Sequence, residues 1–72
     1  MTPMIMRQLW SVVETAQAKT LLQLDDASLV QWLVKQTKTQ ALLDRHETDF
    51  LSDYIKSRLT LIRDMAQERQ YS

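Results

Sequence analysis

The first third of the chain repeats apolar residues every three or four positions. At about 100° per residue, a helix over residues 3–22 would collect on one face Ile5, Met6, Leu9, Trp10, Val12, Val13 and Ala16. Pro3 suits the first helical position, where a missing N–H costs nothing, and Thr2 before it is a suitable N-cap. The pattern therefore predicts an amphipathic helix over about residues 3–22.

A second apolar stretch begins after two aspartates. Asp25 is a suitable N-cap, and Leu24 before it can pack against Leu29 as a hydrophobic staple. The apolar positions that follow are Leu29, Val30, Trp32, Leu33 and Val34. They give way to the polar segment KQTKTQ, so the pattern predicts a helix over about residues 26–37 and leaves its C-terminal end undefined.

The longest predicted helix occupies the C-terminal part of the chain. Asp44 and Glu47 have the spacing of a capping box, with aspartate in place of the usual serine or threonine. The apolar arc that follows contains Phe50, Leu51, Tyr54, Ile55, Leu59, Leu61, Ile62 and Met65. Arg63 falls on the polar arc of the same helix. The pattern predicts one continuous helix over about residues 45–69, on the order of 35–40 Å in length.

The composition favours an all-α fold in a single small domain. The 72 residues include no glycine and one proline, so the chain lacks the residue that β-hairpins and mononucleotide-binding loops require. We expect a small three-helix bundle over residues 1–72, in which the first two helices cover the long third one. Trp10, Leu33 and Ile62 lie near the centres of their apolar arcs and are predicted to be buried.

Such a short chain needs stability beyond its own core. Domains of this size bury only about 60% of the surface that their unfolded chains expose. There is no cysteine, and His46 is the one histidine, which excludes disulfides and multi-histidine zinc sites. Nine basic residues balance nine acidic ones, so self-repulsion is small. These features favour a homodimer, in which a second copy of the chain completes the bundle.

The charge and hydropathy patterns disfavour several classes of function. Nucleic-acid binding is unexpected because no basic face is present. A helix-turn-helix formed by SLVQWLV and the third helix is a minor alternative, since that helix begins with Asp44, Glu47 and Asp49. Uninterrupted apolar runs reach three residues, against about 20 for a membrane span. The start MTPMIMRQLW lacks the pattern of a signal peptide, and a cytoplasmic location is expected.

No cofactor, metal or catalytic site is predicted. His46, Asp49 and Asp53 would share a helical face, but the second carboxylate-rich helix of a bundle metal site is missing, which favours a solvated acidic face. The serines lack a glycine-bearing elbow, and three short helices leave little room for a cleft, so an enzyme is not expected. Trp10, Trp32 and the methionines are interpreted as core residues rather than a ligand pocket.

Arg58 is the least expected residue of the third helix. Its neighbours at three and four positions' distance are Tyr54, Ile55, Leu61 and Ile62. None of them is acidic, and a buried unpaired guanidinium is too costly to keep. Three interpretations are open: the alkyl stem covers the core while the charge reaches water, an acid of another helix (Glu14, Asp25 or Asp26) pairs with it, or Arg58 lies at an interface.

The surroundings of Arg58 define the predicted interaction site, which comprises Tyr54, Arg58, Leu61 and Met65. We predict that the chain is a small helical protein–protein interaction or adaptor module, whose partner is another protein or a second copy of itself. The main alternative is a structural or regulatory homo-oligomer that has no outside partner.

Overall fold

The protein is all-α. A computed structural model describes residues 3–71. Within this range five helices and no strand are present, namely α1 (Pro3–Thr15), α2 (Ala18–Gln23), α3 (Asp26–Gln40), α4 (Arg45–Ser57) and α5 (Leu59–Tyr71). The fold class predicted from the sequence is therefore confirmed, whereas the predicted N-cap Thr2 lies outside the described residues.

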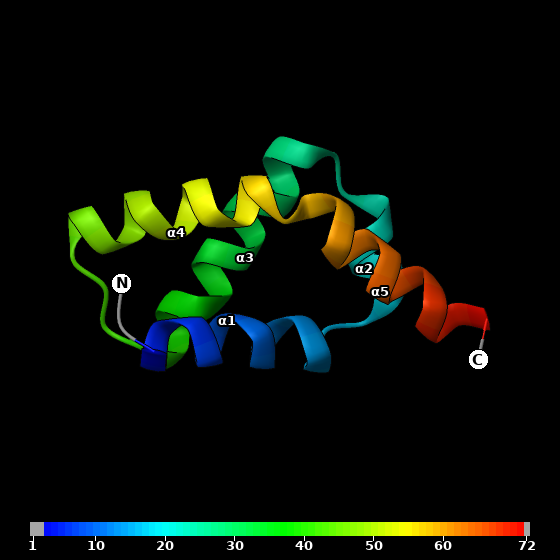
Figure 1. The fold of residues 1–72 in the computed structure, drawn as a ribbon, viewed down its shortest axis with the longest axis horizontal. Helices are drawn as coiled ribbons and strands as arrows, with labels where there is room; N and C mark the ends of the chain where they lie inside the picture. Colours follow the sequence, from blue (N-terminus) through cyan, green and yellow to red (C-terminus); the bar gives the residue numbers. More distant parts are fainter. Residues whose placement is uncertain (1–2, 72) are drawn as a thin grey trace.

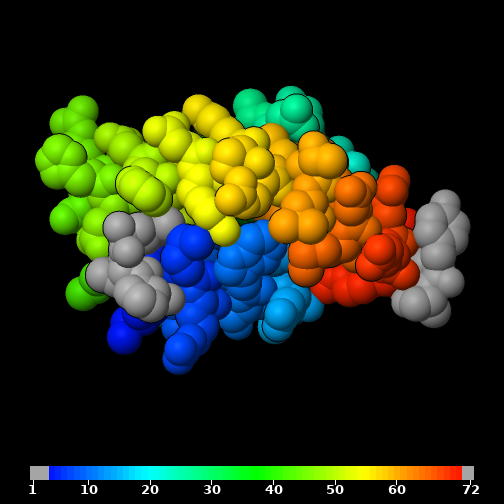
Figure 2. Space-filling view, viewed as in Figure 1, coloured from blue at the N-terminus to red at the C-terminus, as the bar shows by residue number. Residues whose placement is uncertain are grey.

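The helices form two groups along the length of the molecule (Figure 1). α1 and α4 lie on either side of α3, and both pack against it. α2 and α5 form the second group and pack against each other. The molecule measures 36 × 20 × 17 Å along its principal axes, and Figure 2 shows α1, α4 and α5 together on one face.

The helix predicted over residues 3–22 is divided near Gln17. α1 ends at Thr15, and Gln17 has the extended conformation of an N-cap, with φ −69° and ψ 135°. In an unbroken helix Leu21 would be rotated by about 120° from Leu9, which is on the core side of α1. The break allows both leucines to be completely buried. Burial of Leu21 against α5 therefore overrides the helical pattern that continues through this segment.

The long helix predicted over residues 45–69 is divided at Arg58. This residue has φ −118° and ψ 10°, and its N–H donates to the Ile55 carbonyl, three positions back, at 2.9 Å. The Ser57 hydroxyl donates to the Tyr54 carbonyl at 2.7 Å. Such side-chain bonds to the preceding turn compete with helical bonding and bend helices. Regular helical bonding resumes where the Ile62 N–H donates to the Arg58 carbonyl, and α5 then turns onto α2.

Both predicted helix caps of the central region are confirmed. The Asp25 carboxylate accepts from the Ser28 N–H at 2.8 Å at the start of α3. At the start of α4, the Asp44 carboxylate accepts from the Glu47 N–H at 2.7 Å, and the Glu47 side chain accepts from the Asp44 N–H at 3.1 Å. These reciprocal bonds form a complete capping box, so the polar signals at both starts were sufficient to locate them.

The apolar core receives side chains from each of the five helices. Its buried apolar residues are Ile5, Leu9, Val12, Val13, Leu21, Leu29, Val30, Leu33, Leu51, Ile55, Ile62 and Ala66. The predicted burial of Leu33 and Ile62 is confirmed, whereas Trp10 is only half-buried at the edge of the core. Thr37 is buried as well, because its hydroxyl donates to the Leu33 carbonyl at 2.9 Å, and α3 continues past the predicted end at residue 37 to Gln40.

Candidate interaction surface

The four residues of the predicted interaction site come from α4, α5 and the junction between them. Tyr54 lies on α4, Arg58 caps its C-terminus, and Leu61 and Met65 lie one turn apart on α5. Tyr54 and Met65 both face α1. The Tyr54 ring meets the Trp10 ring edge-on, with 6.4 Å between ring centroids and an interplanar angle of 86°. Met65 lines a pocket together with Val13 of α1.

Exposed apolar side chains extend this surface. Phe50, one turn before Tyr54 on α4, is 54% exposed, and Leu61 is 47% exposed. Trp10, Tyr54 and Met65 are half-buried beside them and pack against the core. Together these residues form the aromatic face, which consists of Trp10, Phe50, Tyr54, Arg58, Leu61 and Met65. It combines large apolar groups that keep contact with solvent and one cation.

The guanidinium of Arg58 stays on its own helix. Its central carbon lies 5.1 Å from the centroid of the Tyr54 ring, and Nη1 donates to the Ser57 hydroxyl at 3.3 Å. The residue is exposed. The predicted alternative in which an acid from another helix of the same chain pairs with Arg58 is therefore wrong, because the break at Arg58 takes it off the continuous apolar arc. The interpretation of Arg58 as an interface residue stays a prediction.

Arg63 makes the inter-helix contacts that the sequence suggested for Arg58. Its Nη1 donates to the Leu21 carbonyl at 3.1 Å, and its Nη2 donates to the Leu24 carbonyl at 2.9 Å. Nη2 also forms an ion pair with the Asp26 carboxylate at 2.8 Å. The sequence pattern placed Arg63 on the polar side of the third helix. The signal that could have found it is the short helix ending before Asp25, because the last carbonyls of a helix need donors and attract cations.

The junction beside Arg63 also contains a perturbed carboxyl group. Hydrogen bonds from Ser28 hold the pKa of Asp25 below its usual value of 3.8, and the nearby Arg63 charge adds a smaller lowering. Both causes favour the ionised carboxylate. The role of this group is to cap α3, because its oxygen already accepts the Ser28 N–H.

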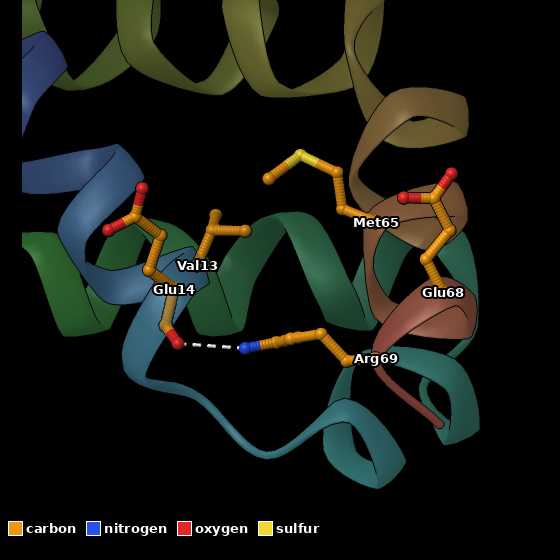
Figure 3. Close-up of a pocket in the computed structure, with 5 residues that line it drawn as sticks. All are labelled: Val13, Glu14, Met65, Glu68 and Arg69. Carbon is orange, nitrogen blue, oxygen red and sulfur yellow. Dashed lines mark hydrogen bonds between the residues drawn. The ribbon is translucent and has the colours of Figure 1, made fainter. Parts of the chain in front are cut away.

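A shallow pocket of about 360 Å³ lies at the end of the aromatic face, between α1 and α5 (Figure 3). Met65 and Val13 point into it, and the carboxylates of Glu14 and Glu68 stand at its sides. The guanidinium of Arg69 donates to the Glu14 carbonyl at 2.7 Å across the pocket. The pocket thus has an apolar floor and a rim that carries two carboxylates and one guanidinium.

Other predicted features stay apart from this surface. His46, Asp49 and Asp53 are all exposed on α4, and within residues 3–71 no cluster of three or more histidine and acidic side chains is arranged to hold a metal ion. No helix in that range combines the length and the apolar character required to cross a membrane. No protein-family model matches the chain, and comparisons with curated proteins and with solved structures found no match.

Proposed function

We propose that the chain is a small helical protein–protein interaction module that binds its partner through the aromatic face. The observation that carries the proposal is the juxtaposition of exposed Phe50 and Leu61 with the Trp10–Tyr54 ring pair and the Arg58 guanidinium. Tryptophan, tyrosine and arginine contribute most often to the binding energy of protein interfaces. Phenylalanine and methionine are likewise enriched there, and charged residues other than arginine are depleted.

The geometry of Arg58 supports a role in recognition rather than in folding. Its guanidinium is held over Tyr54 while the residue is exposed, so its donors can reach a carboxylate of a partner. A partner that covers this face would also remove Phe50 and Leu61 from water. Each fully buried side chain of this size contributes roughly 1.5–3 kcal/mol.

Site-directed photocrosslinking tests this proposal. A benzophenone amino acid is placed at Leu61 or, as a matched control on the same helix, at exposed Gln67, which is rotated by about 120° from Leu61. Irradiation is carried out in the cells that naturally express the chain. We expect a discrete adduct from position 61 that weakens when Arg58 is replaced by Glu, and none of that mass from position 67. No adduct, or equal adducts from both positions, would contradict the proposal.

The mass of the adduct separates an outside partner from a second copy of the chain. The chain has a mass of 8.5 kDa. An adduct of twice this mass would support the homo-oligomer, the alternative favoured by the small size and zero net charge of the chain. Any other mass would support an interaction or adaptor module. In both cases the aromatic face is the binding surface.

A further inference from the structure

We propose that the groove between α3 and α4 is a second docking site, for a helical peptide segment that carries acidic residues beside aliphatic ones. This site lies on a different side of α4 from the aromatic face. Ser52 lines the groove, and it is rotated by about 160° from Tyr54 around the helix axis. The proposal concerns a surface that the proposed function does not use, so each can fail without the other.

The groove consists of two adjoining hollows with an apolar floor. The hollows have volumes of about 370 Å³ and 310 Å³, and Val30 lines both of them. Val30 is buried, and the half-buried side chains of Val34 and Leu59 continue the floor on either side of it. Along α3 the lining residues extend from Asp26 to Lys38. That distance is about 18 Å, or three turns of a helix.

The rim of the groove carries an excess of positive charge. Lys35 and Lys38 lie at one end, and Lys56 lies at the other. All three are exposed, and no ion pair to any of them is seen within residues 3–71. Two aspartates also line the groove, and Asp26 is already paired with Arg63. The remaining negative charge of Asp49 balances only one of the three lysine charges. The groove is thus a positive region on a chain whose net charge is zero.

This combination selects the class of occupant. Two apolar hollows in line accept two aliphatic side chains from successive turns of a helix, as in other helix-in-groove complexes. Lysines at both ends then favour aspartate or glutamate on the flanks of that helix. A nucleic acid is less suited, because the lining residues described here include neither an arginine nor an aromatic ring for base stacking. Asp49 would also repel phosphates.

An unbiased peptide selection tests this inference. The folded chain is used to select from a displayed library of random peptides about 16 residues long, which is enough for three helical turns and flanks. We expect the selected peptides to be enriched in Asp and Glu and to repeat Leu, Ile or Val at spacings of three or four. Synthetic copies bound to ¹⁵N-labelled protein should shift the amide signals of Val30, Val34 and Leu59.

Charge-reversal variants identify the site. Lys35→Glu/Lys38→Glu should weaken peptide binding by about tenfold or more. The control Arg7→Glu/Lys19→Glu makes the same change in net charge at exposed positions of α1 and α2 and should change the affinity by less than about twofold. If the first variant does not fold, as judged by circular dichroism, Lys35→Gln/Lys38→Gln removes the charges without reversing them. Affinities are measured by fluorescence anisotropy.

Several outcomes would overturn the inference. These are a selection that yields no acidic peptides, binding that both double variants weaken equally, and displacement of the peptide by a single-stranded oligonucleotide at equal concentration. Binding that is lost in Leu61→Glu but kept in Lys35→Glu/Lys38→Glu would place the peptide on the aromatic face instead. That result would reject the groove and support the proposed function, whereas the reverse pattern would support the groove alone.

Discussion

Arg63 and Arg58 lie little more than one helical turn apart, yet they have opposite surroundings. The side chain of Arg63 is 25% exposed, and its guanidinium joins α5 to the end of α2 through two backbone carbonyls and the Asp26 carboxylate. Arg58 is exposed, and within residues 3–71 its guanidinium contacts Tyr54 and Ser57, both side chains of α4. One arginine therefore joins helices of the fold to one another, whereas the other stays on the surface of its own helix.

The difference shows what determines the role of a cation in a small helical domain. The end of α2 presents fixed carbonyl oxygens that no helical N–H satisfies, and the planar fork of Arg63 fits several of them at once. Arg58 has a ring face as its neighbour, and a cation–π contact at an exposed site contributes only about 0.5–1 kcal/mol. Arg63 is expected to stabilise the fold, and Arg58 to be available for recognition.

The first prediction compares the contributions to stability of two neighbouring residues on different sides of α5, one buried and one exposed. Ile62 is completely buried, whereas Leu61 is 47% exposed on the aromatic face. Ile62→Ala should lower the free energy of unfolding by about 2–5 kcal/mol because it leaves a cavity, and in so small a domain this change can abolish folding. Leu61→Ala should change it by less than about 0.5 kcal/mol. Urea denaturation measures both, and equal losses would contradict the assignment of the two sides.

The second prediction compares the two arginines directly. Arg63→Met keeps an apolar stem but leaves the carbonyls of Leu21 and Leu24 and the Asp26 carboxylate without this donor. We expect a loss of about 2 kcal/mol in the free energy of unfolding. This corresponds to a decrease of roughly 8–16 °C in the melting temperature of a domain of this size.

The matched control is Arg58→Met, for which we expect a loss of at most about 1 kcal/mol, the value of an exposed cation–π contact. Calorimetric melting of both variants decides the comparison. If Arg58→Met is the more destabilising of the two, Arg58 has a structural role that its contacts in this fold do not explain.

The contrast between the arginines also explains which features the sequence could predict. The caps at Asp25 and Asp44 and the burial of Leu33 and Ile62 follow from local patterns, and all were predicted correctly. The breaks at Gln17 and Arg58 were not predicted, because the chain has no glycine and no internal proline to mark them. The break at Gln17 follows from the packing of α2 against α5, which is a tertiary effect. The break at Arg58 coincides with the bond from the Ser57 hydroxyl to the Tyr54 carbonyl, and a serine within a helical pattern does not by itself predict such a bond.

The candidate site shows the same division. The pattern grouped Tyr54, Arg58, Leu61 and Met65, and the fold adds Trp10 of α1 as the ring partner of Tyr54. A continuous-helix pattern placed Arg63 on the polar side, because it contained no information about the carbonyls at the end of α2. The groove between α3 and α4 depends on how these two helices pack against each other. The apolar pattern within a single helix does not determine that packing.

The third prediction concerns association through the aromatic face. Arg58→Glu should lower the free energy of unfolding by at most about 1 kcal/mol, because it removes the exposed cation–π contact with Tyr54. It should weaken self-association or partner binding by about tenfold, since it reverses a charge at the centre of that face. Sedimentation equilibrium at micromolar concentrations measures self-association. A single species near 8.5 kDa, with a melting temperature independent of concentration, would contradict a homodimer. Crosslinking from position 61 then reports on an outside partner.

The smallest expected effect is a pH dependence of stability that comes from Asp25, at the α2–α3 junction where Arg63 binds. The pKa of Asp25 is lower in the folded chain than its usual value of 3.8, because Ser28 donates to the carboxylate and the Arg63 charge lies nearby. A carboxyl group whose folded pKa is lowered contributes stability above its unfolded pKa, and this contribution is lost as the pH falls through the lowered value.

Asp25→Asn keeps a suitable N-cap but does not titrate. Its melting temperature should therefore be below that of the parent at neutral pH and approach it as the pH falls below about 4. Asp53→Asn, which removes an exposed carboxylate from α4, is the control and should show no such convergence. If the melting temperatures of both variants equal that of the parent at every pH, the ionised Asp25 carboxylate makes no measurable contribution to the stability of the α2–α3 junction.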